Sequence, residues 1–150
     1  MNRREMIAAS AGVVALCMTN STEAADKMAG FIAGDDASMK NWLLKECQME
    51  YFHLGIPTDQ DMKWDTYLEN LKLHIMEYEN DPFGIEWMKF DEGTPMPEII
   101  VKRPHVAFKI ANFDEAVKKF KLLVPVSSPR PGMKTCFIEH KGIGIEFVSK

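Results

Sequence analysis

Two short motifs each occur twice in this chain and in the same order. His53-Leu-Gly-Ile is matched by His105-Val-Ala-Phe, and Phe83-Gly-Ile-Glu-Trp is matched by Ile143-Gly-Ile-Glu-Phe. Internal similarity of this kind indicates a fold assembled from two related units. The separation from His to Glu is 33 residues in the first copy and 41 in the second. The sequence therefore predicts two related modules, with the first one abbreviated, at about residues 49–92 and 103–150.

Hydrophobic periodicity places most of both modules in strands. The expected strands are residues 51–58, 71–78, 85–90, 104–110, 122–126, 133–139 and 143–148. A short amphipathic helix is expected over residues 37–48, with Asp36 as its N-cap. A second helix is expected after Asn112, where Glu115 could reach back to complete a capping box. The proline-containing segment 91–104 is expected to be a connector.

The first 25 residues have the pattern of an export signal. Arg3 and Arg4 precede a weakly apolar stretch, and small residues follow at Ala24 and Ala25. The paired arginines resemble the twin-arginine signal of bacterial exported proteins. We expect residues 1–25 to be a signal peptide and residues 26–48 a linker with a short helix. A buried N-terminal helix is the alternative. The expected location is the periplasm.

Composition excludes several classes of protein. Eighteen basic and twenty-two acidic residues give a net charge of −4, which argues against a nucleic-acid-binding protein. No apolar run reaches the roughly 18–20 residues of a membrane span. The three cysteines show no C-x-x-C spacing, which excludes a cysteine zinc ribbon. After export, Cys47 and Cys136 would remain, either paired or as free thiols.

Period-two alternation in the strands places each repeated glutamate beside a glycine. Glu86 shares a strand face with Gly84, and Glu146 shares one with Gly144, where the missing side chain would leave room for a ligand. The opposite, apolar faces are expected to carry Ile85, Trp87, Ile143, Ile145 and Phe147. A carboxylate among apolar strand residues must be solvated, paired or bound to a metal. Two such carboxylates and the two repeated histidines would make an N2O2 metal site.

These ordered motifs resemble the vicinal oxygen chelate superfamily, which includes glyoxalase I, methylmalonyl-CoA epimerase, extradiol dioxygenases and bleomycin-resistance proteins. The resemblance covers about residues 49–150 and is strongest in the second half. It implies an α+β fold in which two βαβββ-type modules form an open, cupped mixed sheet around a metal. The ligand positions of the superfamily correspond to His53, Glu86, His105 and Glu146. One divalent ion is therefore expected, with Zn, Ni, Co, Mn and Fe all compatible with nitrogen and oxygen ligands.

The function that the resemblance implies is that of a metal-dependent lyase or isomerase. Its substrate would be a small molecule that presents two neighbouring oxygens to the metal, and Glu146 or Glu86 would act as the base. Met88 and Phe90 could line the substrate cup. A site could form within one chain, although relatives often pair as homodimers.

Two other functions remain open at this point. An Fe(II) extradiol-type dioxygenase would use His53, His105 and Glu146 as a facial triad. A non-catalytic protein like the bleomycin-resistance members would only bind a small ligand. Glyoxalase I itself is disfavoured, because the chain after the signal has only Arg103 and Arg130 to bind the carboxylates of glutathione.

Overall fold

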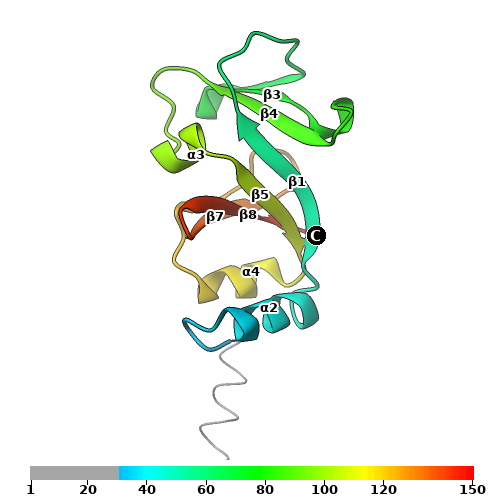
Figure 1. The fold of residues 1–150 in the computed structure, drawn as a ribbon, viewed down its shortest axis with the longest axis vertical. Helices are drawn as coiled ribbons and strands as arrows, with labels where there is room; N and C mark the ends of the chain where they lie inside the picture. Colours follow the sequence, from blue (N-terminus) through cyan, green and yellow to red (C-terminus); the bar gives the residue numbers. More distant parts are fainter. Residues whose placement is uncertain (1–30) are drawn as a thin grey trace, which may run out of the picture.

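The computed structural model describes residues 31–150, so the expected signal peptide lies outside the described residues. Eight strands form one mixed sheet in the order β2-β3-β4-β1-β5-β8-β7-β6, and the sheet curls along its length (Figure 1). The predicted α+β class with a curled mixed sheet is confirmed. The strands are β1 Glu50–Pro57, β2 Thr66–Leu68, β3 Leu73–Met76, β4 Ile85–Phe90, β5 His105–Ile110, β6 Val124–Ser127, β7 Thr135–His140 and β8 Ile143–Ser149.

The two halves of the sheet have the same internal strand order. In each half the first strand runs parallel to the fourth, so β1 pairs with β4 and β5 pairs with β8. The fourth strand then pairs antiparallel with the third, and the third with the second. The halves are joined by antiparallel pairing of β1 with β5. The two first strands therefore lie side by side in the middle of the sheet.

Two helices cover one face of the second half of the sheet. The helix α2 (Asp36–Lys45) lies beside α4 (Phe113–Ala116), which continues as a 3-10 turn over Val117–Lys119. Their apolar side chains pack against β5, β7 and β8, and the buried members of this core are Leu43, Cys47, Ile110, Phe113, Ala116, Val117, Cys136, Ile138 and Phe147. Burying one large side chain of this kind stabilises the fold by about 1.5–3 kcal/mol.

The first half of the sheet buries its apolar residues on the other side. No helix lies between β1 and β2 in this part of the chain, and the buried cluster is Leu73, Ile75 and Met88. Ile85 and Trp87 were predicted to form the apolar face of β4, but both are only half-buried. That prediction is wrong because no helix covers their face. The core of this half forms on the side that carries Glu86.

Asn112 is the N-cap residue of α4, as predicted, but the predicted cap of α2 is wrong by one residue. The N-cap of α2 is Asp35, whose carboxylate accepts hydrogen bonds from the backbone N–H groups of Ala37 and Ser38. Asp36 instead forms an ion pair with Lys141, with 2.6 Å between Oδ2 and Nζ. A sequence of two adjacent aspartates cannot distinguish these roles, because either residue is a good N-cap.

The predicted capping box at Asn112 does not form. Asn112 adopts a left-handed conformation with φ 54°, and its side chain makes no cap hydrogen bond. Its Nδ2 donates instead to the carbonyl of Glu46, 3.3 Å away. Glu115 forms an ion pair with Lys118. The tertiary contact with the end of α2 replaces the local capping pattern.

One strand and one α-helix were absent from the sequence prediction. The short strand β2 lies at the edge of the sheet, and α3 (Glu98–Lys102) forms within the segment that was expected to be a connector. In α3, Ile100 is 1% exposed. A Cβ atom added at Gly144 would lie 2.3 Å from its Cδ1. The helix α3 therefore packs against one side of β8 through Ile100.

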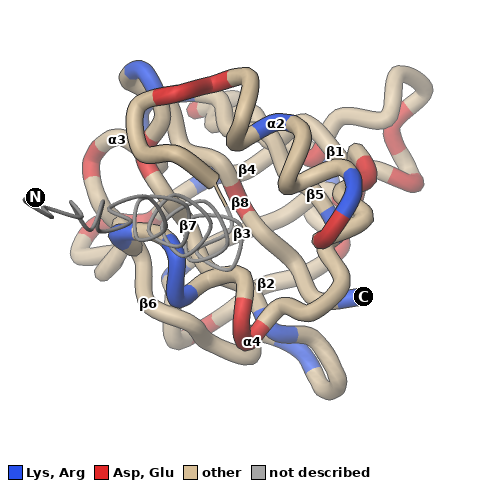
Figure 2. The backbone as a smooth tube through the Cα atoms, turned by 90° about the horizontal axis from the view of Figure 1, so that it is seen from below, with Lys and Arg blue, Asp and Glu red and all other residues tan. Residues whose placement is uncertain are grey.

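Basic and acidic residues are interspersed along the described chain (Figure 2). Several form ion pairs between elements, including Lys134 with Asp114 and Lys150 with Glu50. Exposed pairs of this kind contribute at most about 1 kcal/mol each. Within residues 31–150, no helix combines the length and the apolar character that crossing a membrane requires.

The two core cysteines generate a prediction about thiol reactivity. Cys47 and Cys136 are free thiols that are 1% and 0% exposed. Burial raises the pKa of Cys47 to about 11 and that of Cys136 to about 12. Near pH 8 both remain protonated, so iodoacetamide should alkylate them only as the chain opens. Mass spectrometry of each cysteine should show slow modification in the native protein and fast modification in guanidinium chloride. Fast native alkylation would contradict the burial of the two thiols in the core.

Candidate metal centre

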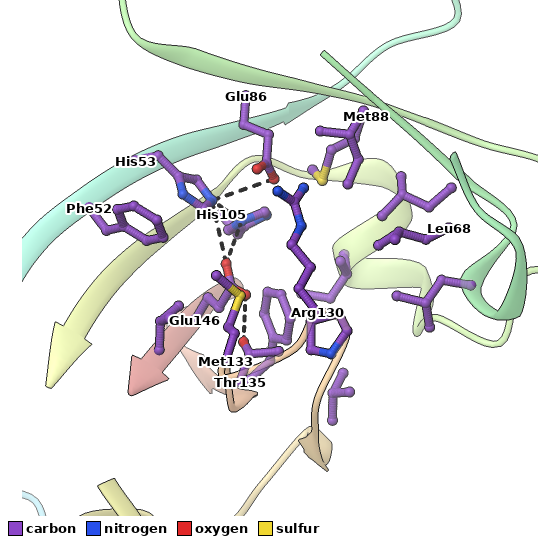
Figure 3. Close-up of a pocket in the computed structure, with 18 of the residues that line it drawn as sticks. Phe52, His53, Leu68, Glu86, Met88, His105, Arg130, Met133, Thr135 and Glu146 are labelled. Atoms are coloured by element: carbon purple, nitrogen blue, oxygen red, sulfur yellow. Dashed lines mark hydrogen bonds and ion pairs between the residues drawn. The ribbon is translucent and has the colours of Figure 1, made fainter. Parts of the chain in front are cut away.

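The four side chains predicted to bind a metal come from the four central strands. They point toward one another from the same face of the sheet (Figure 3). Each strand supplies one of them, namely His53 from β1, Glu86 from β4, His105 from β5 and Glu146 from β8. His53 and His105 are 4% and 1% exposed, and Glu146 is 9% exposed. The sequence repeat therefore brings together residues that are far apart in the chain.

Small residues between these strands make room for the cluster. Gly55 of β1 lies opposite both His105 and Glu86 in the cross-strand register. A Cβ atom at Gly55 would lie between 2.1 and 2.7 Å from the His105 ring. Ala107 of β5 lies opposite the other two residues of the cluster. His53 therefore faces Ala107, two positions after His105, and His105 faces Gly55, two positions after His53.

The glycines that the sequence singled out have different roles. Gly84 precedes β4 and has φ 72° in a turn, so it is not a strand position. Gly144 does lie in β8, but Ile100 fills the space beside it. The prediction of room for a ligand is therefore wrong at Gly144. At Gly84 the space is open, but the predicted strand position is wrong. The glycine that the cluster needs is Gly55, because a side chain there would overlap the His105 ring.

Three donor atoms form a nearly equilateral triangle. The Nε2 atoms of His53 and His105 lie 3.4 Å apart. The Glu146 Oε2 atom lies 3.4 Å from the first and 3.3 Å from the second. Metal–ligand bonds of about 2.0–2.1 Å in a tetrahedral site give ligand separations of about 3.3–3.4 Å. The triangle has the dimensions of one face of such a site.

Glu86 approaches the same group from the first half of the sheet. Its Oε1 lies 3.5 Å from the Nε2 of His53. One ligand atom from each of Glu86, His53 and His105 can be chosen so that all three lie within 4.8 Å of one another. This buried cluster could therefore bind a metal ion.

The orientation of the imidazoles also fits a metal. Both Nε2 atoms face the cluster, and both Nδ1 atoms are buried without a hydrogen-bond partner. A neutral imidazole has one nitrogen that donates and one that accepts. If both rings are neutral, their Nε2 atoms cannot both donate to Glu146 and also form a hydrogen bond with each other. Leaving a buried polar atom unpaired costs about 1–3 kcal/mol. The pairing of the four central strands holds this costly arrangement in place.

The two carboxylates have opposite acid–base properties. Burial alone would raise the pKa of Glu146, but hydrogen bonds from His105 and His53 outweigh it and lower that pKa to about 2. Burial raises the pKa of Glu86, and the histidine charges oppose it only in part. For His53, burial lowers the pKa, but the hydrogen bond to Glu146 and the charge of Glu86 outweigh it and leave the pKa raised. Glu146 is therefore the more strongly held anion.

Thr135 fixes the orientation of Glu146. Its hydroxyl donates to the Oε1 atom of that carboxylate over 2.5 Å, which leaves Oε2 for the two imidazoles. Thr135 is 6% exposed. A hydrogen-bonded partner of this kind restricts the rotation of a ligating group.

A cavity of about 320 Å³ opens beside the cluster. Both halves of the sheet contribute to its apolar wall, and the contribution of the first half includes Leu68, Leu71, Leu73, Ile75, Met88 and Phe90. Met88 and Phe90, the two weak substrate-binding candidates, both lie in this wall. The cavity is therefore polar at the cluster and apolar along β3 and β4.

The structure adds cavity residues that the sequence did not indicate. The Tyr78 ring stacks on His53, with 5.7 Å between the ring centres and an angle of 17°. The Arg130 Nη2 atom lies 2.5 Å from the Oε1 atom of Glu77. Neither pair belongs to a repeated motif, so no signal in a single sequence could identify them. His74, in contrast, pairs with Asp91 outside the cavity.

Substitution at Gly55 tests the packing of the two histidine strands. In G55A the new methyl group would overlap the His105 ring, so the free energy of unfolding should fall by about 1–3 kcal/mol. Urea denaturation would measure this change. A107G is the matched control because it lies at the equivalent position of β5 and adds no atoms. An unchanged unfolding midpoint in G55A would contradict the register.

Comparison of the chain with models of protein families, with curated proteins and with solved structures found no match. The function is therefore inferred from the geometry of the described residues.

Proposed function

We propose that the protein binds one divalent metal ion and acts as a lyase or isomerase on a small molecule that has two neighbouring oxygens. The ligands would be His53, Glu86, His105 and Glu146. The observation that carries this proposal is the triangle of two imidazole nitrogens and one carboxylate oxygen with sides of 3.3–3.4 Å. It lies on the wall of a cavity of about 320 Å³, which could hold a small ligand.

The donor set restricts the kind of metal. Its nitrogen and oxygen atoms without thiolate suit Zn, Ni, Co, Mn or Fe(II). Cys136 also lines the cavity, but the group of side chains that could hold an ion contains no thiol. We therefore exclude it from the proposed ligands.

Proton transfer is the step that the protein itself would perform. A divalent ion bound here would polarise a carbonyl oxygen and offset the negative charge left when a neighbouring C–H bond loses its proton. Glu86 is the proposed base because it contacts only His53 within the cluster. Glu146 is held by His53, His105 and Thr135, so it is the proposed anchor.

The repeated strand order supports a relationship to the vicinal oxygen chelate superfamily. Each half has its first and fourth strands parallel, and the halves meet through their first strands. The first half departs from a complete βαβββ module because residues 58–65 contain no helix. We propose the two modules, about residues 49–92 and 103–150, as one vicinal-oxygen-chelate-like domain.

One observation favours a second candidate function. Glu146 contacts both histidines, whereas Glu86 contacts one. Two histidines with one carboxylate are the ligands of Fe(II) oxygenases. Oxygen consumption by the Fe(II)-loaded protein with catechols would favour a dioxygenase, and its absence would favour the isomerase.

Metal binding is the direct test of the proposal. After removal of metals and reloading with Zn, the wild-type protein should retain one ion per chain by elemental analysis. H53A combined with H105A should retain none, because two of the ligands are lost. H74A is the matched control, since His74 pairs with Asp91 outside the cavity. A wild-type protein without metal would instead favour a non-catalytic binding protein.

The two glutamates should differ in their contribution to metal affinity. E146Q removes the charge that faces both histidines, so it should weaken Zn binding by more than the roughly 10–100-fold typical of losing an outer hydrogen-bond partner. E86Q should weaken binding less, because Glu86 contacts one histidine. Competition with a fluorescent chelator would measure both constants. The reverse order would contradict Glu146 as the anchor.

A further inference from the structure

Arg130 crosses from one half of the molecule to the other beside the cluster. It belongs to the segment between β6 and β7, and its guanidinium reaches into the cavity between Glu86 and Met88 (Figure 3). There its Nη2 atom meets the Oε1 atom of Glu77, which follows β3. The same Glu77 oxygen accepts a hydrogen bond of 2.8 Å from the hydroxyl of Thr66. Glu77 is therefore fixed by its own half of the sheet.

Most of the donors of Arg130 remain free. A guanidinium has five N–H groups, and within residues 31–150 its one hydrogen-bonding partner is Glu77. The Arg130 side chain is 37% exposed and the Glu77 side chain 16%. Because one edge of the guanidinium is held in place, the remaining donors are oriented before a ligand arrives.

The guanidinium lies beside the metal cluster. Arg130, Glu77, His53 and Glu86 all line the same cavity, and the guanidinium points toward Glu86 (Figure 3). A ligand small enough for the cavity could reach both groups at once.

The other cation of the cavity is already engaged. In the described part of the chain, the cationic residues that line the cavity are Lys109 and Arg130. The Lys109 Nζ atom lies 4.2 Å from the centre of the Phe52 ring, where a cation–π contact holds it. The planar guanidinium also matches a carboxylate better, because it can donate two parallel hydrogen bonds. Arg130 is the stronger candidate for anion recognition.

We propose that the ligand of the cavity is an organic acid whose carboxylate binds Arg130. Its two neighbouring oxygens face the His53 and His105 cluster, and its apolar part packs on Met88. This inference rests on the proposed function and adds the substrate class. Arg130 is the residue that determines specificity, and Glu77 is a positioning residue.

A pair of probes that differ in charge alone tests this proposal. The acid 3,4-dihydroxyphenylacetate carries two neighbouring oxygens and a carboxylate, and its primary amide has nearly the same shape without the charge. Titration calorimetry with the Zn-loaded full-length protein should show the acid binding about 10–100-fold more tightly than the amide. In R130Q this preference should disappear, because the acid loses its charged partner.

Two further variants separate recognition from structure. R103Q is the matched control, because Arg103 donates to the carbonyl of Gly142 outside the cavity, and its preference for the acid should stay. E77Q keeps a hydrogen-bond acceptor for Arg130 but removes the competing negative charge. It should therefore raise the affinity for the acid by up to about fivefold and leave that for the amide unchanged. A purely structural role of Glu77 would change both affinities alike.

The outcomes distinguish this inference from the proposed function. Equal binding of acid and amide by the wild-type protein would overturn the role of Arg130 and leave the metal site standing. A preference that persists in R130Q would do the same. If the protein holds Zn but binds neither probe, the organic-acid class is overturned. If it holds no Zn at all, the proposed metal-dependent function is itself overturned.

Discussion

The antiparallel pairing of β1 with β5 is the constraint on which the rest of the structure depends. Around this pair, each histidine lies opposite the small residue of the other strand, Gly55 or Ala107. The parallel partners β4 and β8 then bring one glutamate each into the same row as those small residues. A shift of one residue between the strands would turn alternate side chains to the opposite face. The register and the cluster are therefore specified together.

The two halves use this common framework differently. The second half packs its outer face against α2 and α4, and its inner face carries Glu146 and Thr135. The first half has no covering helix within the described residues, so its core of Leu73, Ile75 and Met88 forms on the inner face. These apolar side chains consequently line the cavity. In the proposed function the second half contributes Glu146 as the anchor, and both halves contribute apolar side chains to the cavity.

The sequence repeat was sufficient to predict the four converging residues and the α+β class. It succeeded because the same short pattern occurs at structurally equivalent positions in both halves. Local rules failed where a distant contact decided the outcome. The Asn112 side chain donates to the end of α2 instead of to its own helix, and Ile100 occupies the space at Gly144. Arg130 could not be identified because its partner is 53 residues away in the chain and neither belongs to the repeat.

The central pairing also has a consequence for the order of folding. Its two histidines are separated by 52 residues, and loop closure over such a distance makes assembly slow compared with local helix formation. The isolated halves each lack two of the four converging groups. A tightly bound ion would consequently stabilise only the completed chain, by an amount set by its concentration and affinity. Occupancy of the centre would then report that both halves have docked.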